Sequence, residues 1–346
     1  MTSDDKKINK KWIIAGVVLA IVIVVVLFGE SFIKQIAMNE LKKQINPSSV
    51  TLYRISSENL DLNIFTGSIS ISGFSMLPTD SADYFLKKRM IKSLVKIEAE
   101  SFRLKFLNLY KLIVDKKIDI KKIESTSVTI SLKRNRRFKQ PVDKEQRSFQ
   151  SLFTENFQKA GVGLLDLNKI DFSLYNDQNF EKPFFHLDSL RLNIEDIMID
   201  RQTLKETLPL YFEKLNLTTQ DVYFNSSAYY TLSTSGVEFS LKDTSLAVFG
   251  FRLNPKYTKE KFNKQIKYNR DWFNISVPEI RFNGFDLQSF DSTGLNHFAS
   301  IEVIDPRIEI YRDKTLPDAP FKYKPLLGSL LKKVPVDILV DTISIS

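Results

Sequence analysis

The chain has 346 residues, a formal net charge of +9 and no cysteine. Its length suits one large domain or two ordinary ones. The absence of cysteine excludes disulfides, thiolate nucleophiles and zinc–thiolate sites. The excess of lysine and arginine favours an acidic partner, such as an anionic membrane surface. These basic residues form no recognisable nucleic-acid-binding module, so we expect no nucleic-acid partner.

An uncharged apolar run from Trp12 to Phe28 follows a short, lysine-rich tail. Its length is near the lower limit for a helix that spans a bilayer. Lysines before such a run keep the N-terminus in the cytoplasm, and no small-residue cleavage site follows it. We therefore expect an uncleaved single-pass anchor rather than a signal peptide. The predicted organisation is a cytoplasmic basic tail over 1–11, a transmembrane helix with its extension over 12–46, and one main domain over 47–346.

Apolar and polar residues alternate in segment after segment of the main domain. This period of two places the apolar side chains of a strand on one face of a sheet. Helical patterns are few, and no linker rich in Gly, Pro or Ser interrupts the alternation. We therefore predict a mainly β fold with one long, curved antiparallel sheet. Examples of the alternation are Ile118–Ile120, Val128–Leu132, Leu190–Ile194 and Ile308–Ile310.

The alternation slips within several segments and then resumes, as in Ile194–Ile199 and Ile280–Leu287. Such a slip is typical of a β-bulge, at which a long strand bends and continues. The few predicted helices are short insertions between strands. They span 84–94, 149–159 after a capping Ser148, 256–266 after Pro255, and 323–333 before Pro335.

The apolar face of such a sheet needs a cover. A buried Leu, Ile or Phe contributes roughly 1.5–3 kcal/mol, whereas a whole domain is stable by only about 5–15 kcal/mol. So many apolar side chains cannot stay in water. The cover is a second sheet, a set of helices or an apolar ligand. Helices are too few, and a closed β-sandwich is the more common outcome of this pattern. A membrane anchor favours the other alternative, a groove filled with lipid.

No catalytic or metal-binding constellation stands out. His186 and His297 are far apart and have no ligand spacing. The Gly161–Gly163 segment lacks the third glycine of a dinucleotide-binding loop. Most carboxylates occupy outward positions of the alternation, which a solvated face explains. We therefore expect that the protein is not an enzyme and has no cofactor and no metal.

The order of elements in the first third of the chain carries a family resemblance. An N-terminal transmembrane helix precedes a strand pair over 60–71, a strand over 96–104, a leucine-rich connector and a long alternating segment over 118–134. This order resembles the start of the AsmA-like proteins of diderm bacteria, whose relatives include TamB. The resemblance covers about residues 11–134, and the rest of the chain is similar in pattern only.

The resemblance implies a repeating β-groove, a taco-like sheet with an apolar inside and a polar outside, as in bridge-like lipid transfer proteins. It implies an inner-membrane anchor, a periplasmic main body and a part in phospholipid transport from the inner to the outer membrane, and hence in outer-membrane biogenesis. The implied partners are phospholipid acyl chains and the inner membrane. The inward residues expected to line the groove and contact acyl chains are Ile69, Ile71, Ile118, Ile120, Val128, Ile130, Leu132, Leu190, Leu192, Ile194, Phe239, Phe282, Leu287, Ile308 and Ile310.

The alternation runs up to Ile345, so we expect the sequence to be the N-terminal part of a longer protein, whose further part would contact outer-membrane or envelope proteins. The alternative function is an anchored β-sandwich ectodomain with a structural or envelope-assembly role. The two differ in geometry. The sandwich predicts two sheets packed about 10 Å apart, whereas the groove predicts a single sheet with an open trough.

Overall fold

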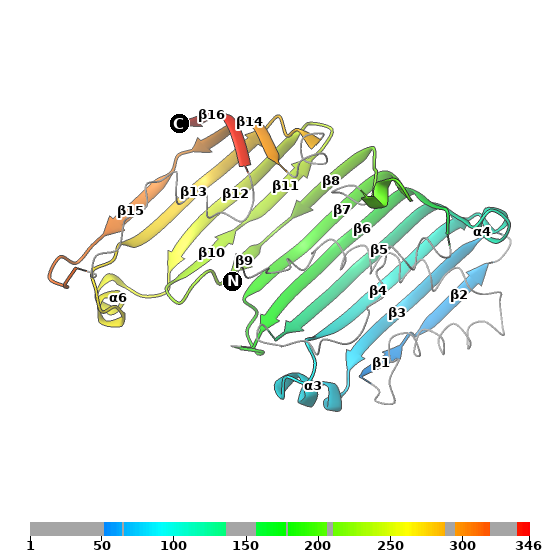
Figure 1. The fold of residues 1–346 in the computed structure, drawn as a ribbon, viewed down its shortest axis with the longest axis horizontal. Helices are drawn as coiled ribbons and strands as arrows, with labels where there is room; N and C mark the ends of the chain where they lie inside the picture. Colours follow the sequence, from blue (N-terminus) through cyan, green and yellow to red (C-terminus); the bar gives the residue numbers. More distant parts are fainter. Residues whose placement is uncertain are drawn as a thin grey trace, which may run out of the picture.

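The fold is one very large β-sheet (Figure 1). All 16 described strands belong to it, and its order has two ends, β1 with β2 at one and β16 at the other. The predicted mainly β fold is confirmed. The expected tail and anchor lie outside the described residues. The computed structural model describes residues 52–63, 66–135, 157–177, 179–205, 210–287, 295–318 and 338–346.

The longest strands lie in the N-terminal half of the sheet. The strands of that half are β1 (Tyr53–Ser56), β2 (Asn59–Asn63), β3 (Ser68–Pro78), β4 (Ser93–Leu107), β5 (Lys117–Arg134), β6 (Lys159–Asn176) and β7 (Phe185–Asp200). The remaining strands are β8 (Lys214–Thr219), β9 (Val222–Phe224), β10 (Tyr230–Thr234), β11 (Gly236–Ser240), β12 (Ser245–Pro255), β13 (Trp272–Asn283), β14 (Asn296–Ile304), β15 (Arg307–Tyr311) and β16 (Ile338–Ile345).

Several short strands are halves of one interrupted long strand. β1 and β2 both pair with β3, and β8 and β9 both pair with β7. In the same way β10 and β11 pair with β12, and β14 and β15 pair with β13. Each pair keeps the same register on both sides of its interruption. Long strands that kink without losing register therefore build the sheet.

Two neighbouring pairs, β5 with β6 and β14 with β16, are parallel, so the predicted antiparallel sheet is wrong at these two places. A parallel pair requires the chain to return to the end of the sheet at which the first strand began. Ile118 pairs with Ala160 and Asn296 with Ile338, so in both pairs the partner lies 42 residues further along the chain. Alternation reports which face a side chain occupies but not strand direction, so the sequence pattern could not reveal these pairs.

The predicted slips in alternation are backbone kinks. Asp196 in the first predicted slip and Gly284 in the second have φ angles of +53° and +68°, in the left-handed region that strands normally avoid. A kink of this kind shifts the alternation by one residue. Before the kink, the apolar residues are at every second position, and after it they are at the positions in between. The shift at the kink therefore keeps both sets on the same face of the sheet.

The kinks line up from strand to strand in a row that crosses the whole sheet, which we call the crease. The crease includes six residues whose φ is positive: Gly73, Ser127, Lys169, Ser189, Gly250 and Asp305. Between most neighbouring strands, the residue pairing keeps the same register on both sides of the crease. In sheet order, the crease passes through or beside Glu58, Gly73, Glu100, Ser127, Lys169, Ser189, Asp221, Ser235, Gly250, Pro278 and Asp305.

The described helices are short and lie at the ends of strands (Figure 1). Helix α3 (Asp80–Lys87) begins after Thr79, whose hydroxyl accepts a hydrogen bond from the Ala82 amide. The predicted helix over 84–94 is therefore placed too late, because this cap starts the helix early and β4 begins at Ser93. The leucine-rich connector contains helix α4 (Leu109–Ile113), which the sequence pattern did not predict.

Helix α6 (Lys259–Gln265) confirms the prediction of a helix over 256–266, but Pro255 ends β12 instead of preceding the first helical residue. A short 3₁₀ helix, η1 (Thr203–Lys205), follows β7. The predicted helix over 149–159 is wrong at its end, because Lys159 begins β6. The rest of it up to 156, and the helix predicted over 323–333, lie outside the described residues.

None of the helices in the described part of the chain has the length and apolar character needed to span a membrane. The predicted anchor, Trp12–Phe28, lies outside that part.

Gly67 provides a stability test of the kinked backbone. Its φ is +59°, and a Cβ atom there would lie 2.1 Å from the main-chain oxygen of Leu107. Gly67→Ala should lower the free energy of unfolding by at least about 2 kcal/mol, because a left-handed alanine is strained and the carbonyl cannot move aside. The measurement is urea unfolding of the full chain in mild detergent. Gly161→Ala in β6 is the control, since its nearest neighbour would be 3.9 Å away; equal losses in both variants would contradict the prediction.

Candidate functional site

One face of the sheet carries an apolar row from edge to edge. Directly paired residues project to the same face, so the register identifies the members of the row. Only Ser125 among them is polar. In sheet order the first apolar row contains Leu60, Ile71, Phe102, Ser125, Leu167, Leu192, Leu217, Phe239, Leu246, Phe282, Ile301 and Ile343.

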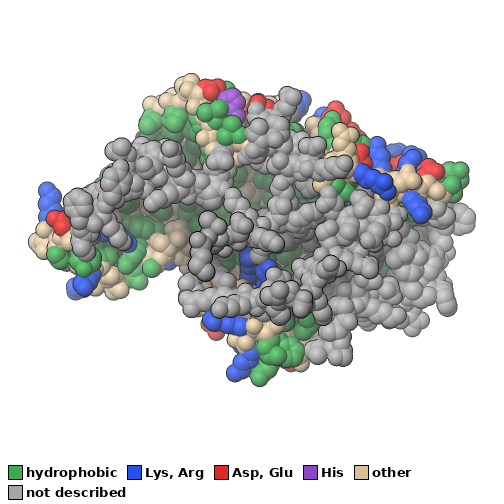
Figure 2. Space-filling model, in the orientation of Figure 1, with side chains coloured by type: hydrophobic (Ala, Val, Ile, Leu, Met, Phe, Trp, Pro, Cys, Tyr) green, Lys and Arg blue, Asp and Glu red, His purple; other side chains and the backbone are tan. Residues whose placement is uncertain are grey.

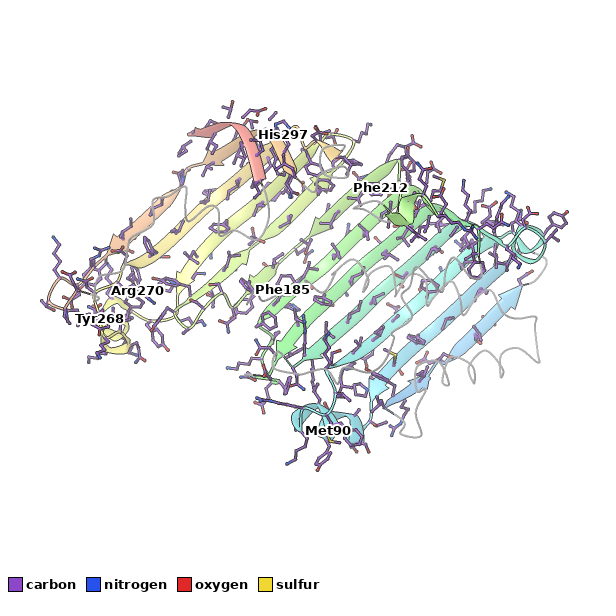
Figure 3. All side chains as sticks on the ribbon, in the orientation of Figure 1. Met90, Phe185, Phe212, Tyr268, Arg270 and His297 are labelled. Carbon is purple, nitrogen blue, oxygen red and sulfur yellow. The ribbon has the colours of Figure 1, made fainter. Side chains whose placement is uncertain are left out.

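A second apolar row runs on the other side of the crease. It has no polar member at all over nine strands. In sheet order it contains Val95, Leu132, Leu174, Phe185, Phe224, Leu232, Leu253, Ile275 and Ile308. Because the kinks shift the alternation by one residue, both rows belong to one continuous surface, which we call the apolar face. In Figure 3 the side chains over the middle of the viewed sheet are mostly carbon, and Phe185 lies near its lower edge.

The opposite face is polar over the same strands. In each strand, the residue next in sequence to the member of the first apolar row has a charged, amide or hydroxyl side chain, and these residues form a row of their own. In sheet order these are Asp61, Ser70, Arg103, Glu124, Asp166, Asn193, Asn216, Ser240, Ser245, Asn283, Ser300 and Thr342. The sheet therefore separates a surface suited to water from one that avoids it.

The polar face is held by charge pairs around Glu124. Its carboxylate lies 2.7 Å from Lys105 Nζ and 2.8 Å from Lys122 Nζ, and Lys122 also lies 3.3 Å from Asp166. Burial alone would raise the pKa of Glu124, but these two lysines outweigh it and lower the pKa to about 2. The ionisable side chains of this cluster therefore form ion pairs that join neighbouring strands.

The residues predicted to line a groove lie together on the apolar face, with one exception. Ile69, Ile118, Ile120, Leu132 and Ile194 are buried there. The half-buried members are Ile71, Val128, Ile130, Leu190, Leu192, Phe239 and Phe282. The exception is Leu287, which follows the end of β13 instead of lying in a strand and packs against the main apolar cluster.

Burial of the apolar face changes along the sheet. Around β4 to β7 it forms the main apolar cluster, closed at the strand ends by Leu112 of α4, Leu204 of η1 and Phe212. At the other end, Ile308 and Ile310 of β15 are 59% and 60% exposed, and Ile343 and Ile345 of β16 are 66% and 71% exposed. These isoleucines lie at the end of the sheet, where a ligand could reach them.

Aromatic side chains extend the apolar face between these two ends. The rings of Phe282 and Phe298 are 5.3 Å apart, as are those of Phe285 and Phe298, and Phe239 lies 5.8 Å from Phe285. Figure 2 shows hydrophobic side chains over the middle of the sheet, while most visible charged side chains lie around the periphery of the view.

Sequence reasoning missed the first part of β6 and the middle of the apolar rows. Ala160, Val162 and Leu165 are buried in the main cluster. The glycines between them hide the alternation, so no strand was predicted between the helix expected to end at 159 and the later apolar residues of β6. Phe224 and Leu232 were missed because β9 and β10 are too short to show a period.

The two histidines lie in separate hydrogen-bonded pairs. His186 Nδ1 lies 2.9 Å from Ser173 Oγ, and His297 Nε2 lies 3.1 Å from Asp341. In the described part of the chain, no three His, Asp or Glu side chains are grouped so that they could hold a metal ion.

The chain matches no protein-family model, and no curated protein is similar to it at a significant level.

The charge cluster on the polar face predicts a pH-dependent stability. The folded pKa of Glu124 lies below its ordinary value of 4.5, so its stabilising contribution is complete above about pH 4.5 and is lost as the pH falls towards about 2. Glu124→Gln should therefore lower the free energy of unfolding by about 1–2 kcal/mol at pH 7, and the difference from wild type should shrink between pH 5 and pH 3. Urea unfolding at several pH values measures this.

Glu98→Gln is the matched control, because Glu98 is on the sheet surface, is 44% exposed and has one exposed lysine as its partner. It should change stability by under about 0.5 kcal/mol at any of these pH values. A Glu124→Gln difference that stays constant with pH would contradict the assignment.

Ser125 gives a second test, of the apolar face itself. Ser125 is 2% exposed, and its hydroxyl has no hydrogen-bond partner among the residues that the structure describes. An unsatisfied buried hydroxyl costs about 1–3 kcal/mol, so Ser125→Ala should leave stability unchanged or raise it by about 1 kcal/mol in urea unfolding. Thr126→Ala, which removes an exposed hydroxyl bonded to Ser101, should not raise stability. A marked loss of stability in Ser125→Ala would show that the hydroxyl is needed.

Proposed function

We propose that the apolar face is a binding surface for lipid acyl chains, and that the protein is a membrane-anchored β-groove that contributes to phospholipid transport between the inner and outer membranes of a diderm cell. The observation that carries this proposal is the pair of apolar rows, with a polar row on the reverse side. The first row crosses the sheet with Ser125 as its one polar member, and the second runs over nine strands. A surface that is apolar along a whole sheet fits a chain-like apolar ligand better than a compact one.

The crease supports a trough shape. Kinks bend strands and increase their twist, and here they recur at the same level in strand after strand. We propose that these bends fold the two apolar rows towards each other, so that acyl chains lie between them and headgroups stay at the rim. No covalent step is needed, because the lipid moves along an apolar track.

The single sheet favours the groove over the alternative sandwich. A sandwich covers one apolar sheet with another, and the described strands all belong to one sheet. The exposed isoleucines of β15 and β16 also favour a ligand surface over a closed core, because burying each would contribute roughly 1.5–3 kcal/mol. The cellular setting rests on the apolar run Trp12–Phe28 and on the resemblance to AsmA-like proteins.

The proposal is tested by the phospholipid that co-purifies with the full chain in mild detergent, measured by mass spectrometry. We expect phospholipid in stoichiometric or greater amounts. Ile130→Lys, on the half-buried apolar face of β5, should reduce the bound lipid by about tenfold or more, since a charged group opposes acyl chains there. Thr129→Lys places the same charge on the neighbouring exposed, outward position and should retain the lipid.

Ile310→Lys guards against a folding defect, because Ile310 is 60% exposed and tolerates a lysine in water. It should also lose lipid while keeping wild-type thermal stability. A lipid-free wild-type protein that is fully stable, or equal lipid content in all variants, would overturn the proposal.

A further inference from the structure

A polar cavity of about 510 Å³ opens at the end of the strands in the middle of the sheet. It lies between the end of β6, the segment leading into β7, the turn between β9 and β10, and the residue after β12. These elements meet at the lower edge of the sheet near Phe185 (Figures 1 and 3). Its volume lies within the range of sites that bind small molecules.

The cavity is positively charged. Lys182 and Lys256 both line it, and no Asp or Glu is among the described residues that do so. Within the described part of the chain neither lysine makes an ion pair with a carboxylate. Burial lowers the pKa of the Lys256 ammonium from its ordinary value, as expected for a charge that no carboxylate balances.

Several polar side chains around the lysines use their oxygen atoms to accept hydrogen bonds. The side-chain oxygen of Asn179 accepts from the main-chain amides of Glu181 and Lys182 at 2.7 and 3.0 Å. The side-chain oxygen of Asn225 accepts from Lys256 Nζ. Each asparagine is thereby oriented with its oxygen occupied, so its NH₂ group remains to donate.

Ser227 follows the same rule. Its hydroxyl oxygen accepts from the main-chain amides of Tyr229 and Tyr230 at 3.2 and 3.1 Å, and its carbonyl accepts from Lys256 Nζ. The hydroxyl proton therefore remains as a donor. Two ammonium groups, two amides and a hydroxyl, all with donors to offer, are complementary to a ligand rich in acceptors and negative charge.

The cavity adjoins the apolar face through Phe224. This residue lines the cavity and is also a member of the second apolar row, where it pairs with Phe185 and Leu232. Its ring lies 6.4 Å from that of Phe184, which lines the cavity as well. A ligand with an anionic group in the cavity would therefore place an attached hydrocarbon chain on the apolar face.

We propose that this cavity binds a phosphate group through Lys182, Lys256, Asn179, Asn225 and Ser227, and that in a lipid complex it holds the headgroup phosphate of a phospholipid. The lipid part rests on the proposed function, whereas the phosphate site does not. The site fixes one lipid at the rim of the sheet, with its acyl chains leading away over Phe224.

The test compares the binding of three probes to the full chain in a nonionic detergent, by isothermal titration. The probes are dioctanoylphosphatidylglycerol, dioctanoylglycerol, which lacks the phosphate, and inorganic phosphate. The variant is Lys182→Gln with Lys256→Gln. The matched control is Lys242→Gln with Lys314→Gln, which removes the same charge from two exposed lysines outside the cavity.

We expect the wild type and the control to bind dioctanoylphosphatidylglycerol about tenfold or more tightly than dioctanoylglycerol. The cavity variant should lose that difference and still bind dioctanoylglycerol. Inorganic phosphate that competes with the phospholipid in the wild type, and not in the variant, would support the same site with the lipid as its source of phosphate.

The other outcomes separate the two proposals. If phosphate binds to the wild type and not to the variant, while neither lipid binds, the phosphate site stands with free phosphate as its ligand and the proposed function fails. If both lipids bind equally to the wild type, headgroup recognition is overturned and the lipid surface stands. If the cavity variant binds every probe as the wild type does, the phosphate site is overturned.

Discussion

The structure depends on keeping apolar side chains on one face of long strands that are kinked. A strand has a side-chain period of two, so a shift of one residue would turn its apolar set over to the other face. Here each shift coincides with a backbone kink, such as Ser127 in β5 and Lys169 in β6. Because these two residues are neighbours in the parallel pair, both strands shift at the same level, and the pairs beyond them on the apolar face remain apolar against apolar. One kink out of line would bring Ile130 beside polar residues such as Asp171 and Ser173.

This constraint explains why the polar face is rich in paired charges. A sheet with one apolar face can form its ladder with any neighbour of the same pattern, so register needs additional specificity. The lysines around Glu124 provide it on β4 and β5, and Lys214 does so between β7 and β8 by binding Glu195 at 2.6 Å. Exposed ion pairs contribute little stability each. Here each of them joins a particular residue of one strand to a particular residue of the next, as Lys105 of β4 is joined to Glu124 of β5.

The face of each strand could be predicted from the sequence because alternation is a local property. Ile118, Ile130 and Leu192 were placed on one surface from period two alone, and the register puts them there. The slips at Asp196 and Gly284 were visible as broken alternation for the same reason. The directions of the strands and the boundaries of the helices could not be predicted from the sequence. A parallel partner 42 residues away depends on the path of the chain between strands, and the start of α3 depends on a single capping threonine. The cavity at Lys182 and Lys256 was also hidden, since it joins residues from four separate segments whose only common property is their place at the strand ends.

The position of that cavity follows from the same geometry as the apolar face. Main-chain pairing between strands stops at the strand ends, so turns there can direct amide and hydroxyl donors outward. The apolar rows stop one or two residues before those turns, as Phe224 does before Asn225. Any amphipathic ligand that lies on the face must therefore place its polar end at a rim, and the rim at β6, β9 and β12 carries two lysines without a facing carboxylate. An apolar face alone would bind hydrocarbon of any kind. We propose that the donor-rich rim beside it restricts the ligand to hydrocarbon with an anionic end, so that selectivity would reside at the strand ends and capacity in the strands.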